Sequence, residues 1–308
     1  MAYERIVVGT GGGATAERAE ARARSLASDL GAEIDAVRAD AAAGEDPASA
    51  ILERAGRRNA DLIVVGNRGM HRRVLGSVPD AVSHRAACDV LIVRTHDRPA
   101  TAPLEPYGAI LCATDGTSTA DRAARKAHAL TRALGADLAL LYIGHPATGR
   151  SILEDTARQL GDPGIRMVLR EGPPAEGIVA AAVEEAADLL VVGTRGLEAS
   201  RLRSLGSVPD RVAHRAPTDL LLAKTYLLAL ADLRPGEGAI VDEGGRKLAV
   251  AIETDGTQHV LSARCKHLGC TVAWNAGDRT WDCPCHGSRY AADGTVIRGP
   301  AQASLDPA

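Results

Sequence analysis

An internal repeat constrains the fold of this chain more than any other feature of its sequence. Residues 75–95 read LGSVPDAVSHRAACDVLIVRT and residues 205–225 read LGSVPDRVAHRAPTDLLLAKT, so 13 of these 21 positions are identical. Upstream, DLIVVGNRG (61–69) matches DLLVVGTRG (188–196). The first two thirds of the chain therefore consist of one unit present twice, and any fold proposed for it must suit both copies.

Short apolar runs alternate with amphipathic segments in each unit. In the second unit the runs lie at 109–113, 137–142, 165–169, 189–192 and 220–223, with helical patterns between them. Continuous apolar strands separated by helices are typical of a parallel sheet that is covered on both faces. The chain contains no Phe, so its core must come mainly from Ala, Val, Leu and Ile. We predict an α/β fold with a doubly wound parallel sheet in each unit, five-stranded in the second.

The first unit is the shorter one. Fifty positions separate Gly11 from Asp61, whereas 73 separate the equivalent Asp115 from Asp188. The missing 23 residues amount to one helix plus one strand. Because the segment from residue 34 resembles the one that begins at residue 165, we expect the first unit to lack its second strand and second helix, which leaves four strands.

Composition shifts divide the chain into domains. We predict one unit at 1–97, a Pro-rich linker at 98–108, a second unit at 109–226 and a separate domain at 227–308. In that last domain, short apolar runs are broken by Gly244-Gly245 and Asp255-Gly256, which are hairpin turn signals. It shows no helical period, so we expect it to be all-β.

Charge and hydropathy argue against two classes of partner. The chain has 36 Lys and Arg against 39 Asp and Glu, evenly spread, and lacks the basic excess that nucleic acids or anionic membranes require. The N-terminal stretch has no signal-peptide core, and the apolar run at 220–231 is short and contains Lys224. We therefore expect a soluble, cytoplasmic protein with no membrane span and no nucleic-acid partner.

Four of the six cysteines crowd into 21 residues beside two histidines. Cys265-Lys-His267 is followed, after 15 residues, by Cys283-Pro-Cys-His286. Two thiolates and two imidazoles from two loops are a ligand set for zinc, or for a [2Fe–2S] centre in which two His replace two Cys on one iron. The ligand types alone leave both metals open. The other two cysteines, Cys88 and Cys112, lie among apolar neighbours and are expected to be small buried hydrophobes.

The residues around these ligands decide between the two metals. The segments CKHLGC and CPCHGSRY, followed by GTVIRGPA, closely resemble the two cluster loops and the Gly-Pro loop of Rieske iron–sulfur proteins. This resemblance covers most of residues 227–308. It implies a [2Fe–2S] cluster with Cys265 and Cys283 on one iron and His267 and His286 on the other.

The same resemblance points to the quinol-oxidising type of Rieske protein. It implies a disulfide between Cys270 and Cys285 that ties the two loops together. It also implies hydrogen bonds from Ser288 and Tyr290 to cluster and cysteine sulfurs, which raise the reduction potential. The membrane anchor of that type is not found in this sequence, and this departure argues against quinol as the partner.

The second unit carries glycines where a phosphate can approach the backbone. Such glycines between a strand and a helix expose N–H groups to an anion. The segments TDGTSTADRA and GTRGLEASRLRSLGSVPDRVAHR resemble the universal stress protein family, whose members form dimers or tandem repeats and in one branch bind ATP. This resemblance, over roughly residues 3–225, implies that Asp115 contacts the ribose or adenine side of ATP. It places the phosphates on Gly193, Gly196, Gly206 and Ser207.

The first unit departs from this pattern. Gly11 stands where the second unit has Asp115, and six residues rather than nine separate Gly69 from Gly76. We therefore expect a structural partner that binds no nucleotide. His84 and His214 occupy equivalent helix positions in the two units, where packing or capping is the expected role.

Two functions follow from these resemblances. The first is a soluble redox protein in which a Rieske cluster carries or senses single electrons, on a tandem platform that binds ATP or a partner protein. We expect a redox protein as its partner and homo-oligomers that form through the stress-protein units. The alternative is the electron-transfer component of a multi-subunit oxidoreductase or oxygenase. The sequence shows no nucleophile with a base and no flavin or nicotinamide fingerprint, so we expect catalysis, if any, to need a second redox protein.

Overall fold

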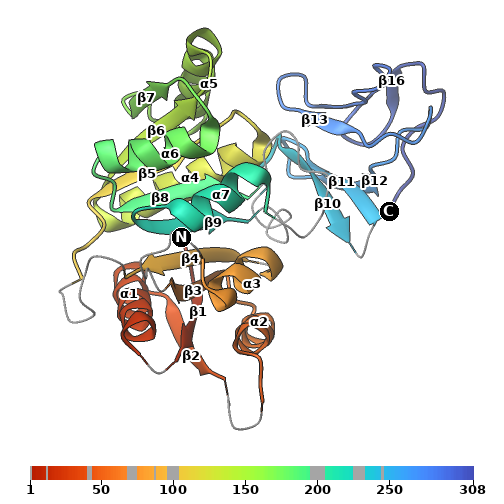
Figure 1. Ribbon diagram of the computed structural model, residues 1–308. Helices are drawn as coiled ribbons and strands as arrows, with labels where there is room; N and C mark the ends of the chain where they lie inside the picture. Colours follow the sequence, from red (N-terminus) through yellow and green to blue (C-terminus); the bar gives the residue numbers. More distant parts are fainter. Residues whose placement is uncertain are drawn as a thin grey trace. The chain divides into compact units, whose positions relative to one another are not determined.

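The computed structural model describes residues 2–11, 13–39, 44–67, 75–86, 88–95, 104–194, 205–224, 233–243 and 246–308. The chain divides into two compact parts, an α/β unit (Met1–Thr225) and a β unit (Tyr226–Ala308) (Figure 1). The predicted fold class, α/β followed by an all-β region, is confirmed. The predicted linker at 98–108 lies partly outside the described residues.

The first half of the α/β unit alternates strands and helices throughout. Its elements are β1 (Arg5–Thr10), α1 (Ala14–Leu30), β2 (Glu33–Arg38), α2 (Pro47–Arg58), β3 (Leu62–Asn67), α3 (Ser77–Arg85) and β4 (Asp89–Arg94). The second half repeats the pattern with two more elements. They are β5 (Ala109–Ala113), α4 (Ser118–Leu134), β6 (Asp137–Ile143), α5 (Pro146–Gln159), β7 (Arg166–Arg170), α6 (Pro174–Glu184), β8 (Leu189–Gly193), α7 (Ser207–Arg215) and β9 (Asp219–Ala223).

The strands of both halves form one nine-stranded sheet, in the order β2-β1-β3-β4-β9-β8-β5-β6-β7. Pairing is parallel within each half. The halves join through β4 and β9, which run antiparallel with a register from Val90↔Leu222 to Ile92↔Leu220. Both of these strands are buried along their whole length, which agrees with the apolar runs at their centres, VLIV in β4 and LLLA in β9.

The first half has four strands, as predicted, but the predicted identity of the missing strand is wrong. β2 pairs with β1 from Arg5↔Glu33 onward, just as β6 pairs with β5, so β2 is the counterpart of the second strand. Within the described residues, the elements without a counterpart are α5 and the edge strand β7. The prediction relied on the likeness between the segments that begin at residues 34 and 165. Short apolar runs resemble one another, so this likeness does not identify equivalent strands. The pairing register of a strand depends instead on the turn that precedes it.

That turn is the same in both halves. Helix α1 ends at Gly31 and helix α4 ends at Gly135, and both glycines have φ +67. Glycine adopts this left-handed conformation without the steric cost of a side chain, so each helix stops and the chain returns beside the first strand of its half.

Apolar side chains cover both faces of the sheet. One layer packs under α2, α3, α6 and α7, the other under α1, α4 and α5, and both layers extend across the two halves. Cys88 and Cys112 lie in these layers, 6% and 0% exposed. Burial raises the pKa of each thiol to about 12, which makes both unreactive, as predicted for structural cysteines.

Two buried aspartates brace the seam between β4 and β9. Each begins the last strand of its own half and accepts a hydrogen bond from a backbone N–H at the end of the other half's last strand. Each also accepts one from a tyrosine at the start of its own half. The bonds are Lys224 N to Asp89 Oδ1 (2.7 Å), Tyr3 Oη to Asp89 Oδ2 (2.8 Å), Arg94 N to Asp219 Oδ1 (2.8 Å) and Tyr107 Oη to Asp219 Oδ2 (2.7 Å).

The β unit contains two antiparallel sheets. One comprises β10 (Gly238–Glu243), β11 (Arg246–Ile252) and β12 (Gln258–Ser262), and the other β13 (Ala273–Asn275), β14 (Thr280–Asp282), β15 (Arg289–Tyr290) and β16 (Val296–Arg298). The predicted turn at Asp255-Gly256 joins β11 to β12, with Gly256 at φ +92. The other predicted turn, Gly244-Gly245, lies outside the described residues.

None of the helices in the described parts of the chain combines the length and the apolar character needed to cross a bilayer.

Candidate metal centre

Two six-residue loops with the same hydrogen-bond pattern carry the predicted ligands. In the first loop, Cys265 N donates to Cys270 O (2.8 Å) and Gly269 N to Cys265 O (2.9 Å). In the second loop, which links β14 to β15, the equivalent bonds join Cys283 N to Ser288 O (2.7 Å) and Gly287 N to Cys283 O (3.0 Å). Both glycines have φ +75, a conformation that side chains disfavour. Each loop therefore turns back on itself and presents its ligands from a fixed frame.

The loops separate the two kinds of ligand by burial. The thiols of Cys265 and Cys283 are buried, at 2% and 3% exposure, whereas His267 and His286 are exposed. The two imidazole rings lie edge to face, with centroids 4.9 Å apart. Two buried thiols with two adjacent, exposed imidazoles match the donor set of a [2Fe–2S] centre whose outer iron is held by two His. The residues present therefore fit such a cluster.

Tyr290 hydrogen-bonds to one of the buried thiols. Its hydroxyl oxygen accepts from Lys266 N (3.1 Å), which leaves the hydroxyl proton to be donated to Cys265 Sγ, also 3.1 Å away. Burial disfavours the Cys265 thiolate, but the bond from Tyr290 and the backbone N–H of His267 outweigh it and lower the pKa of this thiol. Burial, followed by the nearby sulfur, raises the pKa of Tyr290 to about 12, so the phenol keeps its proton.

Ser288, the last residue of the second loop, is fully buried. Its Oγ accepts from Ala301 N (3.0 Å), next to the cis Gly299-Pro300 bond, and its own proton is available to the neighbouring sulfur of Cys265. The structure thus places both predicted hydroxyl groups next to a predicted cysteine ligand.

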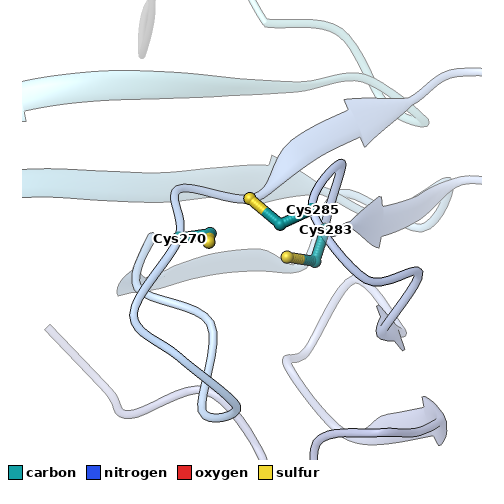
Figure 2. A group of neighbouring side chains, drawn as sticks. All are labelled: Cys270, Cys283 and Cys285. Carbon is teal, nitrogen blue, oxygen red and sulfur yellow. The ribbon is translucent and has the colours of Figure 1, made fainter.

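Cys270 and Cys285 come together in the structure, although both are free thiols. Their Sγ atoms and that of Cys283 lie within 4.8 Å of one another (Figure 2). The hydrogen bond with the Cys270 thiol is the main cause that raises the pKa of Cys285 to about 11. The pairing of these two residues in a disulfide stays a prediction.

One ion pair that supports the second loop was not predicted from the sequence. Arg289 donates two hydrogen bonds to Asp282, from Nε (2.9 Å) and Nη2 (2.8 Å), and thereby links the strands on either side of the second loop. Asn275 also donates to Asp282 (2.9 Å). The signal in the sequence was an Asp directly before the ligand Cys283 and an Arg directly after the buried Ser288, since a two-stranded ladder places them opposite each other.

The predicted nucleotide residues gather at one edge of the second half. Asp115 follows β5, Gly193 ends β8 and Ser207 begins α7, all at the carboxyl ends of the strands. Gly196 lies outside the described residues. The Asp115 carboxylate accepts from the backbone N–H (3.1 Å) and hydroxyl (2.5 Å) of Thr117.

Two of these glycines have structural roles. A Cβ on Gly193 would come within 3.0 Å of the carbonyl oxygen of Thr119, so the start of α4 packs against its bare backbone. The N–H of Gly206 donates to Thr194 O (2.9 Å). Phosphate contacts at these positions therefore stay a prediction.

The chain thus combines a duplicated α/β region with a small β unit that presents two buried thiols and two exposed imidazoles. Comparison with known families gives both parts a family. Residues 41–94 and 146–224 match the model of the universal stress protein family, and residues 224–307 match that of the Rieske [2Fe-2S] domain. The chain therefore carries universal stress protein domains followed by a C-terminal Rieske domain, which implies a [2Fe–2S] cluster.

The similar curated proteins match the Rieske part. The cytochrome b6-f complex iron-sulfur subunit of Synechococcus sp. (strain JA-3-3Ab) is 45% identical over 100 residues, which are 32% of this chain and 49% of that protein. A provisionally named Rieske 2Fe-2S iron-sulfur protein of Bacillus subtilis (strain 168) is 47% identical over 70 residues, 23% of this chain and 14% of its own. The chain thus spans about half or less of these relatives.

A solved structure matches the α/β part. A universal stress protein from Archaeoglobus fulgidus DSM 4304 has a TM-score of 0.51 and 23% identity, over 68% of this chain and 78% of that one. This likeness supports the fold of the α/β unit.

Proposed function

We propose that this chain is a one-electron carrier or redox sensor whose β unit holds a Rieske cluster. In this proposal Cys265 and Cys283 hold one iron, and His267 and His286 hold the other. The observation that carries the proposal is the pairing of two buried thiols with two exposed imidazoles 4.9 Å apart. A cluster bound there supplies reversible one-electron chemistry. The exposed imidazoles leave its outer end accessible to a redox partner.

The residues around the centre tune it. The Tyr290 oxygen lies 3.1 Å from the Cys265 sulfur, and the buried Ser288 is a neighbour of the same sulfur. In this proposal both hydroxyl groups donate hydrogen bonds to cluster and cysteine sulfurs. Such hydrogen bonds favour the more negative, reduced state and raise the reduction potential. The Sγ atoms of Cys270 and Cys285, one from each loop, lie within 4.8 Å of each other, and we propose a disulfide between these residues as a brace between the loops.

Metal analysis and spectroscopy test this assignment. Protein purified without oxygen should contain about two irons per chain and, when reduced, give an electron paramagnetic resonance signal with two nitrogen ligands. Cys283→Ser and His286→Ala should each abolish the signal. The matched controls Cys112→Ser and His259→Ala should retain it. One zinc and no iron in the wild-type protein would refute the proposal.

A second candidate function is that of an electron-transfer component within a larger complex, and the names of the relatives support it. Several are subunits of the cytochrome b6-f complex, so this chain is a candidate electron-transfer component of a larger oxidoreductase. Affinity purification under reducing conditions separates the two functions. Stoichiometric recovery of a flavoprotein or an oxygenase supports the component, and a chain recovered alone supports the free carrier.

A further inference from the structure

A repeated motif on two helices forms a second cluster of metal-binding side chains, remote in sequence from the Rieske loops. Helix α3 carries Asp80 and His84, and helix α7 carries Asp210 and His214. In each helix the two residues are four positions apart, so their side chains lie on one face. The sequence predicted packing or capping for the histidines, and both imidazoles also face the carboxylates of both helices.

The four side chains alternate around a small ring. The nearest atoms are His84 Nε2 and Asp210 Oδ1 (3.4 Å), His84 Nε2 and Asp80 Oδ1 (3.6 Å), His214 Nε2 and Asp80 Oδ1 (3.8 Å), and His214 Nε2 and Asp210 Oδ1 (3.8 Å). Their side chains are 31–42% exposed, so an ion can reach them from solvent.

The charges in this cluster favour a cation. One oxygen of Asp80 and one of Asp210 lie within 4.8 Å of each other and of His84 Nε2. Two carboxylates at this distance repel each other unless a positive charge lies between them. Arg85 and Arg215 follow the histidines, but they pair with Asp46 (3.8 Å), the residue before α2, and with Glu176 (3.0 Å) on α6.

A backbone contact separates the roles of the two histidines. Leu75 N donates to Nδ1 of His214 (3.0 Å). The proton of neutral His214 must therefore be on Nε2, where it is donated to the carboxylates and leaves no lone pair for a metal. Nε2 of His84 contacts the carboxylate oxygens of Asp80 and Asp210. In the tautomer of His84 that carries its proton on Nδ1, the lone pair of Nε2 is free to bind an ion.

We propose that Asp80, His84 and Asp210 bind a divalent metal ion of the zinc class, and that His214 positions the two carboxylates. The 3.4 and 3.6 Å separations around His84 Nε2 match the edge of a tetrahedral zinc site, about 3.4 Å for bonds of about 2.1 Å. One imidazole with two carboxylates suits Zn²⁺ better than Mg²⁺, which prefers six oxygens. Because α3 and α7 belong to different halves, the ion links the halves. This site does not depend on the function proposed for the β unit.

Zinc retention tests the proposal on the full chain with its iron–sulfur cluster loaded. After incubation with Zn²⁺ and gel filtration, mass spectrometry should find about one zinc per chain beside about two irons, unaffected by excess Mg²⁺. Asp80→Asn and His84→Ala should lose this zinc. His214→Phe should weaken zinc binding about 10–100-fold, as expected for a residue that orients ligands. His128→Ala is the matched control, because within the described residues His128 pairs with one carboxylate, that of Asp162 (3.8 Å).

X-ray absorption at the zinc edge of the wild-type protein gives a readout that needs no variant. We expect nitrogen and oxygen ligands at about 2.0–2.1 Å with imidazole scattering and no sulfur at about 2.3 Å. A sulfur shell would mean zinc at the cysteines and would overturn the proposal. So would a wild-type chain that retains no zinc, or an Asp80→Asn chain, folded by circular dichroism, that retains as much as the His128→Ala control.

Discussion

At the residue scale, two buried hydroxyl groups lie beside the proposed cluster ligands. Tyr290 and Ser288 are both fully buried, and each already accepts a backbone N–H, from Lys266 and Ala301 respectively. An oxygen that accepts one bond has its own proton left to donate, and the Cys265 sulfur lies 3.1 Å from the Tyr290 oxygen. A buried hydroxyl group needs an acceptor for its proton. We therefore expect these hydroxyl groups to donate to sulfur and to raise the reduction potential of the proposed cluster.

We expect Tyr290→Phe to lower the reduction potential without loss of iron. The lost hydrogen bond favours the reduced state by about 1–2 kcal/mol, which corresponds to roughly 40–90 mV for one electron. Protein-film voltammetry measures the shift, and Ser288→Ala should act in the same direction. Tyr142→Phe in the α/β unit should leave the potential unchanged. An unaltered potential in Tyr290→Phe would contradict the hydrogen-bond assignment.

Thiol labelling tests the proposed disulfide. If Cys270 and Cys285 are paired, alkylation of the denatured, unreduced protein should label four of the six cysteines, and reduction should expose all six. Cys270→Ser should raise the unreduced count from four to five, because Cys285 becomes free. Cys112→Ser, the control, should lower it by one. Six labelled thiols in the unreduced wild type would exclude the bond.

At the element scale, the seam between β4 and β9 relies on buried polar groups as well as on apolar contact. Asp89 is 1% exposed and accepts from both halves of the α/β unit. A buried acceptor of this kind specifies register, because a slipped strand would leave the Lys224 N–H without its carboxylate.

We expect Asp89→Ala to destabilise the α/β unit by about 1–3 kcal/mol for each buried donor that it strands. Urea unfolding followed by circular dichroism measures the loss. Asp155→Ala removes an exposed carboxylate paired with Arg158, and should cost about 1 kcal/mol at most. Equal stabilities for the two variants would show that the seam does not depend on Asp89.

The ion pairs that Asp35 on β2 forms with Arg54 and Arg58 on α2 should make the stability of the α/β unit depend on pH in the acid range. Burial opposes ionisation of Asp35, but hydrogen bonds from Arg54 and Arg58 outweigh it and lower the pKa of this carboxyl below 3.8. A lowered folded-state pKa contributes stability that is present above the unfolded value and is lost as the pH falls through the folded value. In Asp35→Asn, the free energy of unfolding should therefore fall less steeply below about pH 5. A parallel pH profile for both proteins would contradict this.

At the scale of the whole molecule, the two halves are similar in fold but differ in the edge that faces a ligand. The second half ends its sheet with β6 and β7 and has Asp115 after its first strand. The first half ends with β2 and has Gly11 at the equivalent position. If the α/β unit binds ATP, the second half is the one equipped for it.

We expect calorimetry to find one ATP site per chain. Asp115→Ala should weaken binding, because Asp115 supplies the carboxylate at the ligand-binding edge of the sheet. Asp137→Ala, at the opposite edge of the same half, is the control. Two sites of equal affinity would show that the first half also binds.

Local sequence was enough to predict much of this protein. The repeat, the alternation of strands and helices and the spacing of Cys265, His267, Cys283 and His286 depend on residues close together in the chain, and local patterns report them well. The order of the sheet does not. Which strand the first half lacks, and the merging of both halves through β4 and β9, depend on register and on pairing between distant segments.

The same limit applies to single sites. His84 and His214 looked like packing residues because each helix shows only one Asp and one His on a face. Their cluster exists because the tertiary structure brings α3 beside α7, and Leu75 then decides which nitrogen of His214 carries the proton. Local chemistry determined which side chains the chain could use, and long-range packing decided which of them meet.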